Sequence, residues 1–249
     1  MALNLTIDQG NSTTKLALWD ESGALVDTAV RMHFVSRDVA KVFPGAEIGC
    51  AIYCTVSQRP PTLLGALERR AGSVIEFNVA TPIPVNVEYK SPATLGLDRL
   101  AAAVGAYGLE GCRGKELLVV DLGTAITYDR VTADARYVGG NIAPGIFMRL
   151  KALNHYTARL PLVDPRSYAQ YPLWGDDTVS ALLAGAMRGV VAELEYYRSC
   201  MDGDAVVVLT GGCADTVAHL LSFTPIVEPN LVSRGLNDVI EYQKLNRKQ

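Results

Sequence analysis

The sequence lacks the patterns that mark membrane, secreted and nucleic-acid-binding proteins. No window of its 249 residues approaches the roughly 18 apolar residues that a membrane-spanning helix needs. It has no cluster of Lys and Arg, and its formal net charge is −3, so it offers no basic surface for a nucleic acid. Its first residues do not show the basic start and apolar run of a signal peptide. We therefore expect a cytoplasmic protein that binds neither membranes nor nucleic acids.

The cysteines and histidines form no metal-binding or disulfide pattern. The five cysteines are an odd number and contain no paired CxxC motif. The three histidines, His33, His155 and His219, are scattered without the spacing of metal ligands. We expect the thiols to be reduced and structural, and we assign no chemistry to the histidines.

The composition is that of a globular protein. Hydrophobic residues make up 49% of the chain and charged residues 20%, which argues against disorder. A chain of 249 residues can bury a substantial core and is long enough for two domains.

Two short polar segments resemble each other, and each follows an apolar run that is typical of a β-strand. Residues 8–11 (Asp-Gln-Gly-Asn) follow the run at 3–7, and residues 121–124 (Asp-Leu-Gly-Thr) follow the run at 117–120. An acidic residue at a strand end, with glycine in a tight turn, brings a carboxylate and backbone N–H groups to a point where a phosphate and its metal ion can bind. Two such turns facing each other would hold a nucleotide from both sides.

Both halves of the chain show the same order of predicted elements, β-β-β-α-β-α. The first half has strands at 3–7, 15–19, 24–30 and 47–54 and helices at 36–42 and 62–71. The second half has strands at 117–120, 125–131, 135–140 and 205–210 and helices at 146–154 and 178–197. This repetition indicates an internal duplication, and it predicts an α/β protein of two lobes, each a mixed sheet flanked by helices, with a nucleotide cleft between them. A glycine-containing stretch at 110–114 sets the predicted boundary, with lobes at 1–112 and 113–249.

A third glycine-containing turn, residues 209–213 (Leu-Thr-Gly-Gly-Cys), follows the strand at 205–210 and precedes a predicted helix at 215–222. Glycines at such a junction allow a ligand to approach the backbone near a helix N-terminus. The same glycines could instead serve only to pack the helix against the strand. The sequence leaves both interpretations open.

Five segments taken together, in their order and spacing, resemble the successive motifs of the type III pantothenate kinases. They are residues 8–15 (DQGNSTTK), 96–99 (GLDR), 121–129 (DLGTAITYD), 139–145 (GGNIAPG) and 210–212 (TGG). This family belongs to the acetate and sugar kinase/Hsp70/actin superfamily, and the resemblance covers nearly the whole chain. Gln9 stands where a small apolar residue is usual and Ser12 where Thr is common. Neither difference removes a carboxylate or a glycine.

The resemblance implies an activity and a fold. The activity is ATP-dependent phosphorylation of pantothenate to 4′-phosphopantothenate, the first step of coenzyme A biosynthesis. The fold is a pair of ribonuclease-H-like lobes of the actin-like ATPase type. It further implies Mg²⁺ with the nucleotide, a monovalent cation that is K⁺ or NH₄⁺, and a homodimer with the pantothenate site near the subunit interface.

The resemblance also implies roles for individual residues. The ATP-binding residues would be Asp8, Gln9, Gly10, Asn11, Ser12, Thr13, Thr14, Lys15 and Thr124. The pantothenate-binding residues would be Tyr89, Gly96, Leu97, Asp98, Arg99 and Thr178. Asp98 would accept the proton of the reacting hydroxyl, and Asp121 would bind the monovalent cation.

General chemistry fits these roles. Phosphoryl transfer depends on positioning and charge neutralisation more than on covalent catalysis, and a carboxylate such as Asp98 can take the hydroxyl proton. The planar fork of Arg99 suits the carboxylate of pantothenate. Adjacent side chains on a regular helix point about 100° apart, so Asp98 and Arg99 can address different ends of one substrate only if they lie in an irregular turn.

Several alternatives remain at this stage. Asp98 and Arg99 could form a plain surface ion pair at a helix start, Lys15 could be a solvated strand residue, and Tyr89 could be half-buried packing. The small, apolar run at 182–191 could be a core helix or a dimer interface.

Two rival functions also remain: another small-molecule kinase of the same superfamily, or a nucleotide-binding regulator without catalysis. Loss of Asp8, Asp98 or Asp121 would indicate the regulator, and all three residues are present.

Overall fold

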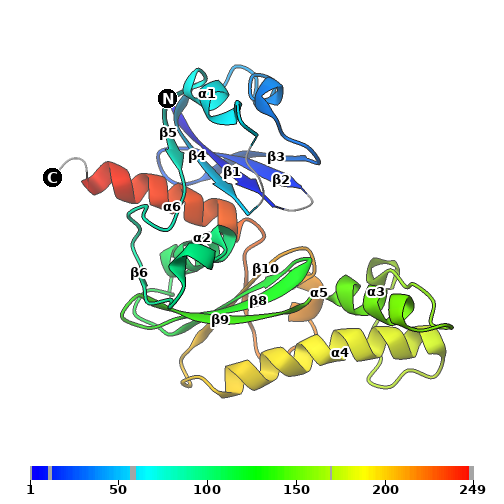
Figure 1. Ribbon diagram of the computed structural model, residues 1–249. Coiled ribbons are helices and arrows are strands. Elements are labelled where there is room, and N and C mark those ends of the chain that lie inside the picture. The colour runs from blue at the N-terminus through cyan, green and yellow to red at the C-terminus, as the bar shows by residue number, and fades with distance from the viewer. Residues whose placement is uncertain (1, 11–12, 57–59, 169, 247–249) are drawn as a thin grey trace. The chain divides into compact units, whose positions relative to one another are not determined.

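The computed structural model describes residues 2–10, 13–56, 60–168 and 170–246, and the chain divides into two compact units (Figure 1). The first unit comprises residues 1–113, 134–138 and 230–249, and the second comprises 114–133 and 139–229. Within the described part of the chain, no helix is both long and apolar enough to cross a membrane.

A five-stranded mixed sheet forms the centre of the first unit. Its strands are β1 (Leu3–Gln9), β2 (Thr14–Trp19), β3 (Leu25–Arg31), β4 (Ile48–Thr55) and β5 (Ala71–Glu76), in the order β3-β2-β1-β4-β5. β1, β2 and β3 are consecutive and antiparallel, whereas β1-β4 and β4-β5 are parallel pairs. The three antiparallel strands predicted at the start of the chain are therefore confirmed.

Apolar side chains from one face of this sheet form a core with a short helix. Leu5, Ile7 and Tyr53 pack with Leu63 and Leu67 of α1 (Leu63–Glu68). Side chains alternate between the two faces of a strand, so Asn4, Thr6 and Asp8 of β1 project from the opposite face.

Two helices predicted in this unit are shorter than expected. The predicted helix at 36–42 is only a 3₁₀ turn, η1 (Ser36–Asp38), and the one predicted at 62–71 is α1. At η1 the carboxylate of Asp38 accepts a hydrogen bond from the backbone N–H of Val35. Short acidic side chains compete in this way with helical backbone bonds, which favours turns over helix interiors.

The helices α2 (Leu97–Gly108) and α6 (Leu231–Asn246) pack together in the first unit. Gly235 of α6 makes the approach close, since a Cβ placed there would lie 1.8 Å from the carbonyl oxygen of Ala101. The first unit thus contains residues 230–249 in addition to the amino-terminal part of the chain. Its bounds differ in this respect from the predicted lobes at 1–112 and 113–249.

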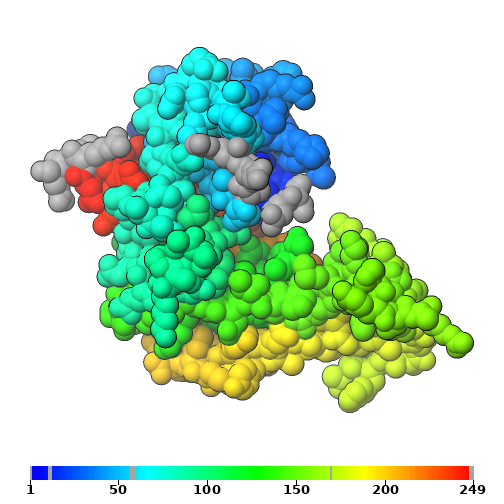
Figure 2. Space-filling view, viewed as in Figure 1, coloured from blue at the N-terminus to red at the C-terminus, as the bar shows by residue number. Residues whose placement is uncertain are grey.

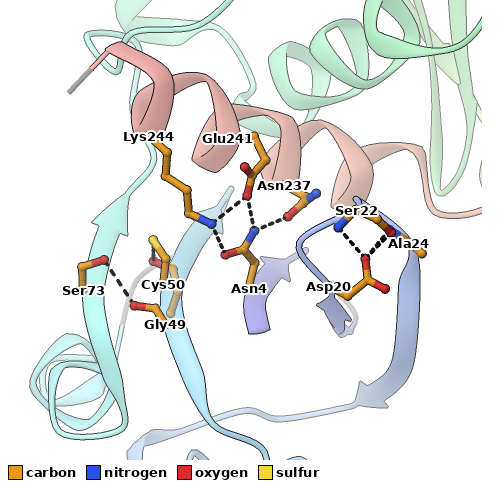
Figure 3. Close-up of polar contacts among 11 residues, drawn as sticks. Asn4, Asp20, Ser22, Ala24, Gly49, Cys50, Ser73, Asn237, Glu241 and Lys244 are labelled. Atoms are coloured by element: carbon orange, nitrogen blue, oxygen red, sulfur yellow. Dashed lines mark hydrogen bonds and ion pairs between the residues drawn. The ribbon is translucent and has the colours of Figure 1, made fainter. Parts of the chain in front are cut away.

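A polar network fastens α6 to the first strand (Figure 3). The side-chain amide of Asn4 donates to Oδ1 of Asn237 at 2.8 Å and to Oε1 of Glu241 at 2.7 Å. The ammonium of Lys244 donates to Oδ1 of Asn4 at 3.0 Å and to Oε1 of Glu241 at 2.7 Å. Asn4, Glu241 and Lys244 also line a cavity of about 540 Å³. Their hydrogen bonds to one another identify this polar wall as part of the contact between α6 and the sheet.

The second unit is built on another mixed sheet. Its strands are β7 (Leu117–Leu122), β8 (Ala125–Val131), β9 (Arg136–Pro144), β10 (Val206–Thr210) and β11 (Ile226–Val227), in the order β11-β10-β7-β8-β9. β7 and β8 are antiparallel, whereas β10 pairs in parallel with β7 and with β11. The start of β9 belongs to the first unit, where it pairs with β6 (Asn86–Val87).

Helices complete the second unit. They are α3 (Ile146–Tyr156), α4 (Thr178–Ser199) and the short α5 (Ala214–Ala218), and the core contains Val120, Leu150, Met187 and Leu209. Two further 3₁₀ turns occur, η2 (Pro92–Thr94) in the first unit and η3 (Pro165–Ser167) in the second. The helix predicted at 215–222 is α5 and ends earlier than expected, whereas the helices predicted at 146–154 and 178–197 correspond to α3 and α4.

Candidate active site

The candidate site residues fall into two groups, one in each unit. Asp8, its turn, Tyr89 and residues 96–99 lie in the first unit, whereas Asp121, Thr124 and Thr178 lie in the second. Each group is built by the local structure of its own unit.

The first group begins where β1 ends. Asp8 and Gln9 are the last residues of β1, and Gly10 closes the turn to β2 by donating its backbone N–H to the carbonyl oxygen of Thr13 at 3.0 Å. The antiparallel register pairs Asp8 with Lys15. Asn11 and Ser12, both predicted to bind ATP, lie outside the described residues.

Gln9 has a partner that the sequence did not suggest. The hydroxyl of Tyr53 in β4 donates a hydrogen bond to Oε1 of Gln9. Only the parallel pairing of β1 with β4 brings together two residues that lie 44 positions apart. No short motif could have predicted the contact.

The second part of this group lies at the start of α2. Gly96 precedes the helix, and Asp98 lies in its first turn, where Oδ1 accepts a hydrogen bond from the backbone N–H of Arg99 at 2.8 Å. A Cβ at Gly96 would lie 2.7 Å from that same carboxylate oxygen, so the missing side chain makes room for the Asp98 carboxylate.

Asp98 and Arg99 do not lie in the irregular turn that would let them address two ends of one substrate. Both belong to the regular helix α2, so their side chains diverge by about 100°. Arg99 is buried, with 6% of its surface exposed, and its guanidinium lies 5.9 Å from the ring centre of Tyr89. The Tyr89 ring in turn packs on Tyr137 at 6.2 Å. Burial of Arg99 argues against the alternative of a surface ion pair.

The buried thiol of Cys54 lies in β4, which pairs with β1 and contacts α2, the helix that carries Asp98. Cys54 is the register partner of Asp8 and has no exposed surface. Burial raises the pKa of the Cys54 thiol well above its usual range, and the negative charges of Asp8 and Asp98 raise it further. β4 therefore lies next to both the strand that carries Asp8 and the helix that carries Asp98.

In the second unit, three glycine-containing motifs meet at the end of β7. Gly211, with φ of +91°, adopts a backbone conformation that favours glycine, and a Cβ there would lie 2.4 Å from Oδ1 of Asp121. The N–H of Cys213 donates to the carbonyl oxygen of Leu122 at 3.3 Å. The N–H of Gly145 donates to the carbonyl oxygen of Thr124 at 3.2 Å. The segments at 121–124, 139–145 and 210–213 therefore share one location.

Thr178 lies elsewhere in the second unit. It is the first residue of α4, and the preceding Asp177 caps the helix by accepting the N–H of Ser180 at 2.7 Å. Hydrogen bonds from Ser180 hold the pKa of the Asp177 carboxyl below its usual value.

The surroundings of Asp121 determine what kind of metal ion the turn can hold. Within the described ranges, no group of three or more His, Cys, Asp and Glu side chains could hold a metal. Asp121 offers a buried carboxylate oxygen among turns that carry backbone carbonyl groups. One carboxylate with several neutral oxygens suits a singly charged cation, because hard cations take oxygen ligands and divalent ones draw more negative charge around them.

The two mixed sheets and the helices that flank them define the class of the protein, an α/β protein built of two units. Solved structures share this fold. A glucokinase from an Antarctic psychrotroph has a TM-score of 0.53 at 11% identity, covering 97% of this chain and 99% of its own. A conserved Baf family transcriptional activator from Campylobacter jejuni has a TM-score of 0.65 at 21% identity, covering 97% and 99%. At these identities the likeness concerns the fold alone.

Sequence relatives identify the family. The family model described as type III pantothenate kinase matches residues 4–199. The type III pantothenate kinase of Porphyromonas gingivalis ATCC 33277 is 36% identical over 97% of this chain and 99% of its own. That of Phocaeicola vulgatus ATCC 8482 is 37% identical over 96% and 98%. The chain belongs to the type III pantothenate kinase family and is a kinase, which confirms the prediction made from its motifs.

Proposed function

We propose that the chain transfers the γ-phosphoryl group of ATP to the primary hydroxyl of pantothenate, with Asp98 as the proton acceptor. Family membership carries the reaction, which is the ATP-dependent phosphorylation of pantothenate at the start of coenzyme A biosynthesis. The single structural observation that supports the residue assignment is that β4 pairs with β1 at Asp8 and also contacts α2, whose first turn carries Asp98, so the strand-end turn and the proposed base flank one strand.

Asp98 is suited to the base role by its fixed orientation. The N–H of Arg99 holds one carboxylate oxygen, and the missing Cβ of Gly96 leaves room beside it. As the hydroxyl oxygen attacks phosphorus, its proton passes to the Asp98 carboxylate. A positioned general base contributes about 10²–10⁴-fold to the rate of such a step.

The turn after β1 is the proposed phosphate-binding element. Its residues are Asp8, Gln9, Gly10, Asn11, Ser12, Thr13, Thr14 and Lys15, and Thr124 is the proposed contact from the second unit. Backbone N–H groups in such a turn bind phosphate oxygens without a covalent step, which is what phosphoryl transfer requires. Lys15 is exposed in β2, so a contact with phosphate remains a prediction.

Asp121 is the proposed ligand of a monovalent cation, K⁺ or NH₄⁺, and Mg²⁺ is proposed to accompany the nucleotide. Such cations would offset the negative charge of the triphosphate. The proposed pantothenate-binding residues are Tyr89, Gly96, Leu97, Asp98, Arg99 and Thr178. Because Arg99 lies buried on Tyr89, we assign the two to one wall of the acceptor pocket.

We also propose a homodimer formed through α3 and α4. The yellow-green surface in Figure 2 belongs to α3 and the chain that follows it. This part of the second unit exposes large apolar side chains, namely Phe147, Met148, Leu153, Tyr156 and Trp174. A shallow, mainly apolar groove beside them has a volume of about 470 Å³ and is lined by residues that include Leu153, Tyr156 and Gly185. Exposed apolar area of this kind marks interaction sites, and a second copy of the chain is the partner that the resemblance implies.

The location of the protein in the cytoplasm also remains a prediction.

The function is tested by a coupled assay of ADP release with ATP, Mg²⁺, K⁺ and pantothenate. Asp98→Asn keeps the size of the side chain but removes the base, so kcat should fall by about 10²-fold or more while the unfolding midpoint stays near that of the wild type. An Asp98→Asn variant with wild-type kcat would refute the base assignment.

The same assay separates the rival functions. A panel of hydroxyl-bearing acceptors should show a preference for pantothenate in kcat/KM, and a larger value for a sugar or short acid would favour another kinase activity. Binding of ATP without transfer to any acceptor would favour a regulator.

A further inference from the structure

Strand register places Tyr53 under the proposed phosphate-binding turn. β1 and β4 run in parallel, with Ile7 opposite Tyr53 and Gln9 opposite Thr55. Side chains alternate along a strand, so Ile7, Gln9 and Tyr53 project from one face of the sheet and Asp8 from the other. Tyr53 is 1% exposed, and its ring belongs to the core that includes Leu63. The ring is therefore held rigidly on the face opposite the carboxylate of Asp8.

Gln9 is fixed through both its backbone and its side chain. Its carbonyl oxygen accepts a hydrogen bond from the N–H of Val56 at 3.3 Å, and its side-chain Oε1 accepts one from the Tyr53 hydroxyl. The next residue, Gly10, closes the turn. The side chain that precedes the turn thus has a fixed support in the core.

The hydrogen bond also decides which chemistry Gln9 presents. A glutamine amide has an acceptor oxygen and a nitrogen with two donor hydrogens. With Oε1 held by the Tyr53 hydroxyl, Nε2 with its two donor hydrogens is the end of the amide turned away from Tyr53. Donor groups suit the oxygens of a phosphate, which are acceptors.

We propose that Tyr53 is a positioning residue of the ATP site, which acts through Gln9 by fixing its amide with the donor nitrogen available to a phosphate oxygen. This inference rests on the proposed function, since it assumes that the turn after Asp8 binds ATP. Tyr53 itself touches no substrate in this proposal and lies in the core.

The test compares Tyr53→Phe, Gln9→Leu and the double variant. Tyr53→Phe keeps the ring in the core and removes only the hydroxyl. It should weaken the binding of a non-hydrolysable ATP analogue, measured by calorimetry, and raise KM for ATP, each by about threefold to tenfold. KM for pantothenate and kcat should change by less than about twofold. Tyr53→Phe should cause no further loss of analogue affinity in the Gln9→Leu background.

Tyr171→Phe is the matched control. Tyr171 is a buried tyrosine in the second unit whose hydroxyl donates to the carbonyl oxygen of Pro165 at 2.8 Å, so its loss should lower stability without changing affinity for the analogue. The proposal is overturned if Tyr53→Phe leaves analogue affinity unchanged, if it alters the KM of both substrates equally, or if its effect adds to that of Gln9→Leu.

Failure of the proposed function would look different. A wild-type chain that binds the analogue but does not phosphorylate pantothenate would refute that activity, whereas the analogue affinities of the variants would still decide the role of Tyr53. A wild-type chain that does not bind the analogue would overturn both.

Discussion

Among single residues, Asp238 is a buried carboxylate that carries no assigned role in catalysis. It lies on α6 against Gly108 of α2, where a Cβ at Gly108 would be 2.4 Å from its Oδ2. That oxygen has no hydrogen-bond partner in the part of the chain that the structure describes. Burial raises the pKa of Asp238 to about 6, although the positive charges of Arg234 and Arg113 act in the opposite direction.

Asp238 should make the protein less stable as the pH rises. The pKa is about 6 in the folded chain and near 3.8 when the group is unperturbed, so the unfolded chain releases the proton first. The free energy of unfolding should therefore fall between about pH 4 and pH 6 and stay low above it, and Asp238→Asn should remove that fall. The free energy of unfolding of the variant should exceed that of the wild type by an amount that grows over this pH range and reaches about 1–3 kcal/mol at its upper end. Urea unfolding of both proteins from pH 4.5 to pH 8 measures the difference, and parallel pH profiles would contradict the prediction.

The residue scale also shows what a sequence can and cannot indicate about the site. Asp8, Asp98 and Asp121 lie in short motifs with glycine, a pattern visible along the chain. Tyr53 lies inside an apolar strand, where tyrosine is ordinary, and only the register between two strands gives its hydroxyl a partner. The motif around Asp98 also did not show whether this residue lies in a regular helix, because the packing of α2 against α6 contributes to that outcome.

At the scale of elements, the contact between α2 and α6 depends on the absence of side chains. Gly105 and Gly235 face each other there, and a Cβ at Gly105 would lie 2.4 Å from the carbonyl oxygen of Leu231. The two helices approach so closely at these glycines that there is no room for even a methyl group. The fit between α2 and α6 is therefore steric and does not depend on charge.

Gly235→Ala should destabilise the protein for this reason. The added methyl group would clash with the backbone of α2, which costs about 1–3 kcal/mol or more, and helix propensity returns no more than about 1 kcal/mol of this. Gly65→Ala in α1 is the control, because its Cβ would meet only the end of the Arg69 side chain at 3.6 Å, an ordinary contact, and only the propensity gain should remain. Urea midpoints of the two variants should move in opposite directions, and equal midpoints would show that the α2–α6 contact can relax.

Elements were predictable where the sequence pattern and the local chemistry agreed. The strands at β1, β2, β7 and β8 have apolar runs that end at polar turns, and they appeared as predicted. α6 was not predicted, although its apolar residues lie on one face of a polar segment, a pattern that is typical of an amphipathic helix. The edge strand β5 was likewise missed, since its Ala-Gly-Ser start gives little signal.

At the scale of the whole molecule, the proposed dimer makes a prediction that does not depend on catalysis. Gly185 lies in the groove beside α3, and a larger side chain there has space within its own chain. Gly185→Trp should therefore weaken association by about tenfold or more while leaving the fold intact, since it obstructs only a partner. Light scattering across a dilution series measures this. The exposed Gly203→Trp serves as control, and an unchanged dimer in Gly185→Trp would exclude this face as the interface.

The division into units was the least predictable feature. Strand order repeated in both halves suggested a single boundary, but contacts made by the last helix assign it to the first unit. The packing of α6 in the first unit depends on contacts between residues at opposite ends of the chain. The periodicity of a single segment does not indicate such contacts.

The packing of α6 in the first unit affects how the protein folds during its synthesis. The ammonium of Lys244 reaches Asn4, a residue 240 positions earlier, so the first unit lacks one wall until α6 has been synthesised. While the ribosome is still adding the second unit, the sheet face that carries Asp8 has no α6 to cover it. We expect nascent chains that stop before residue 230 to be digested readily by proteases, and the addition of α6 to bring protection abruptly.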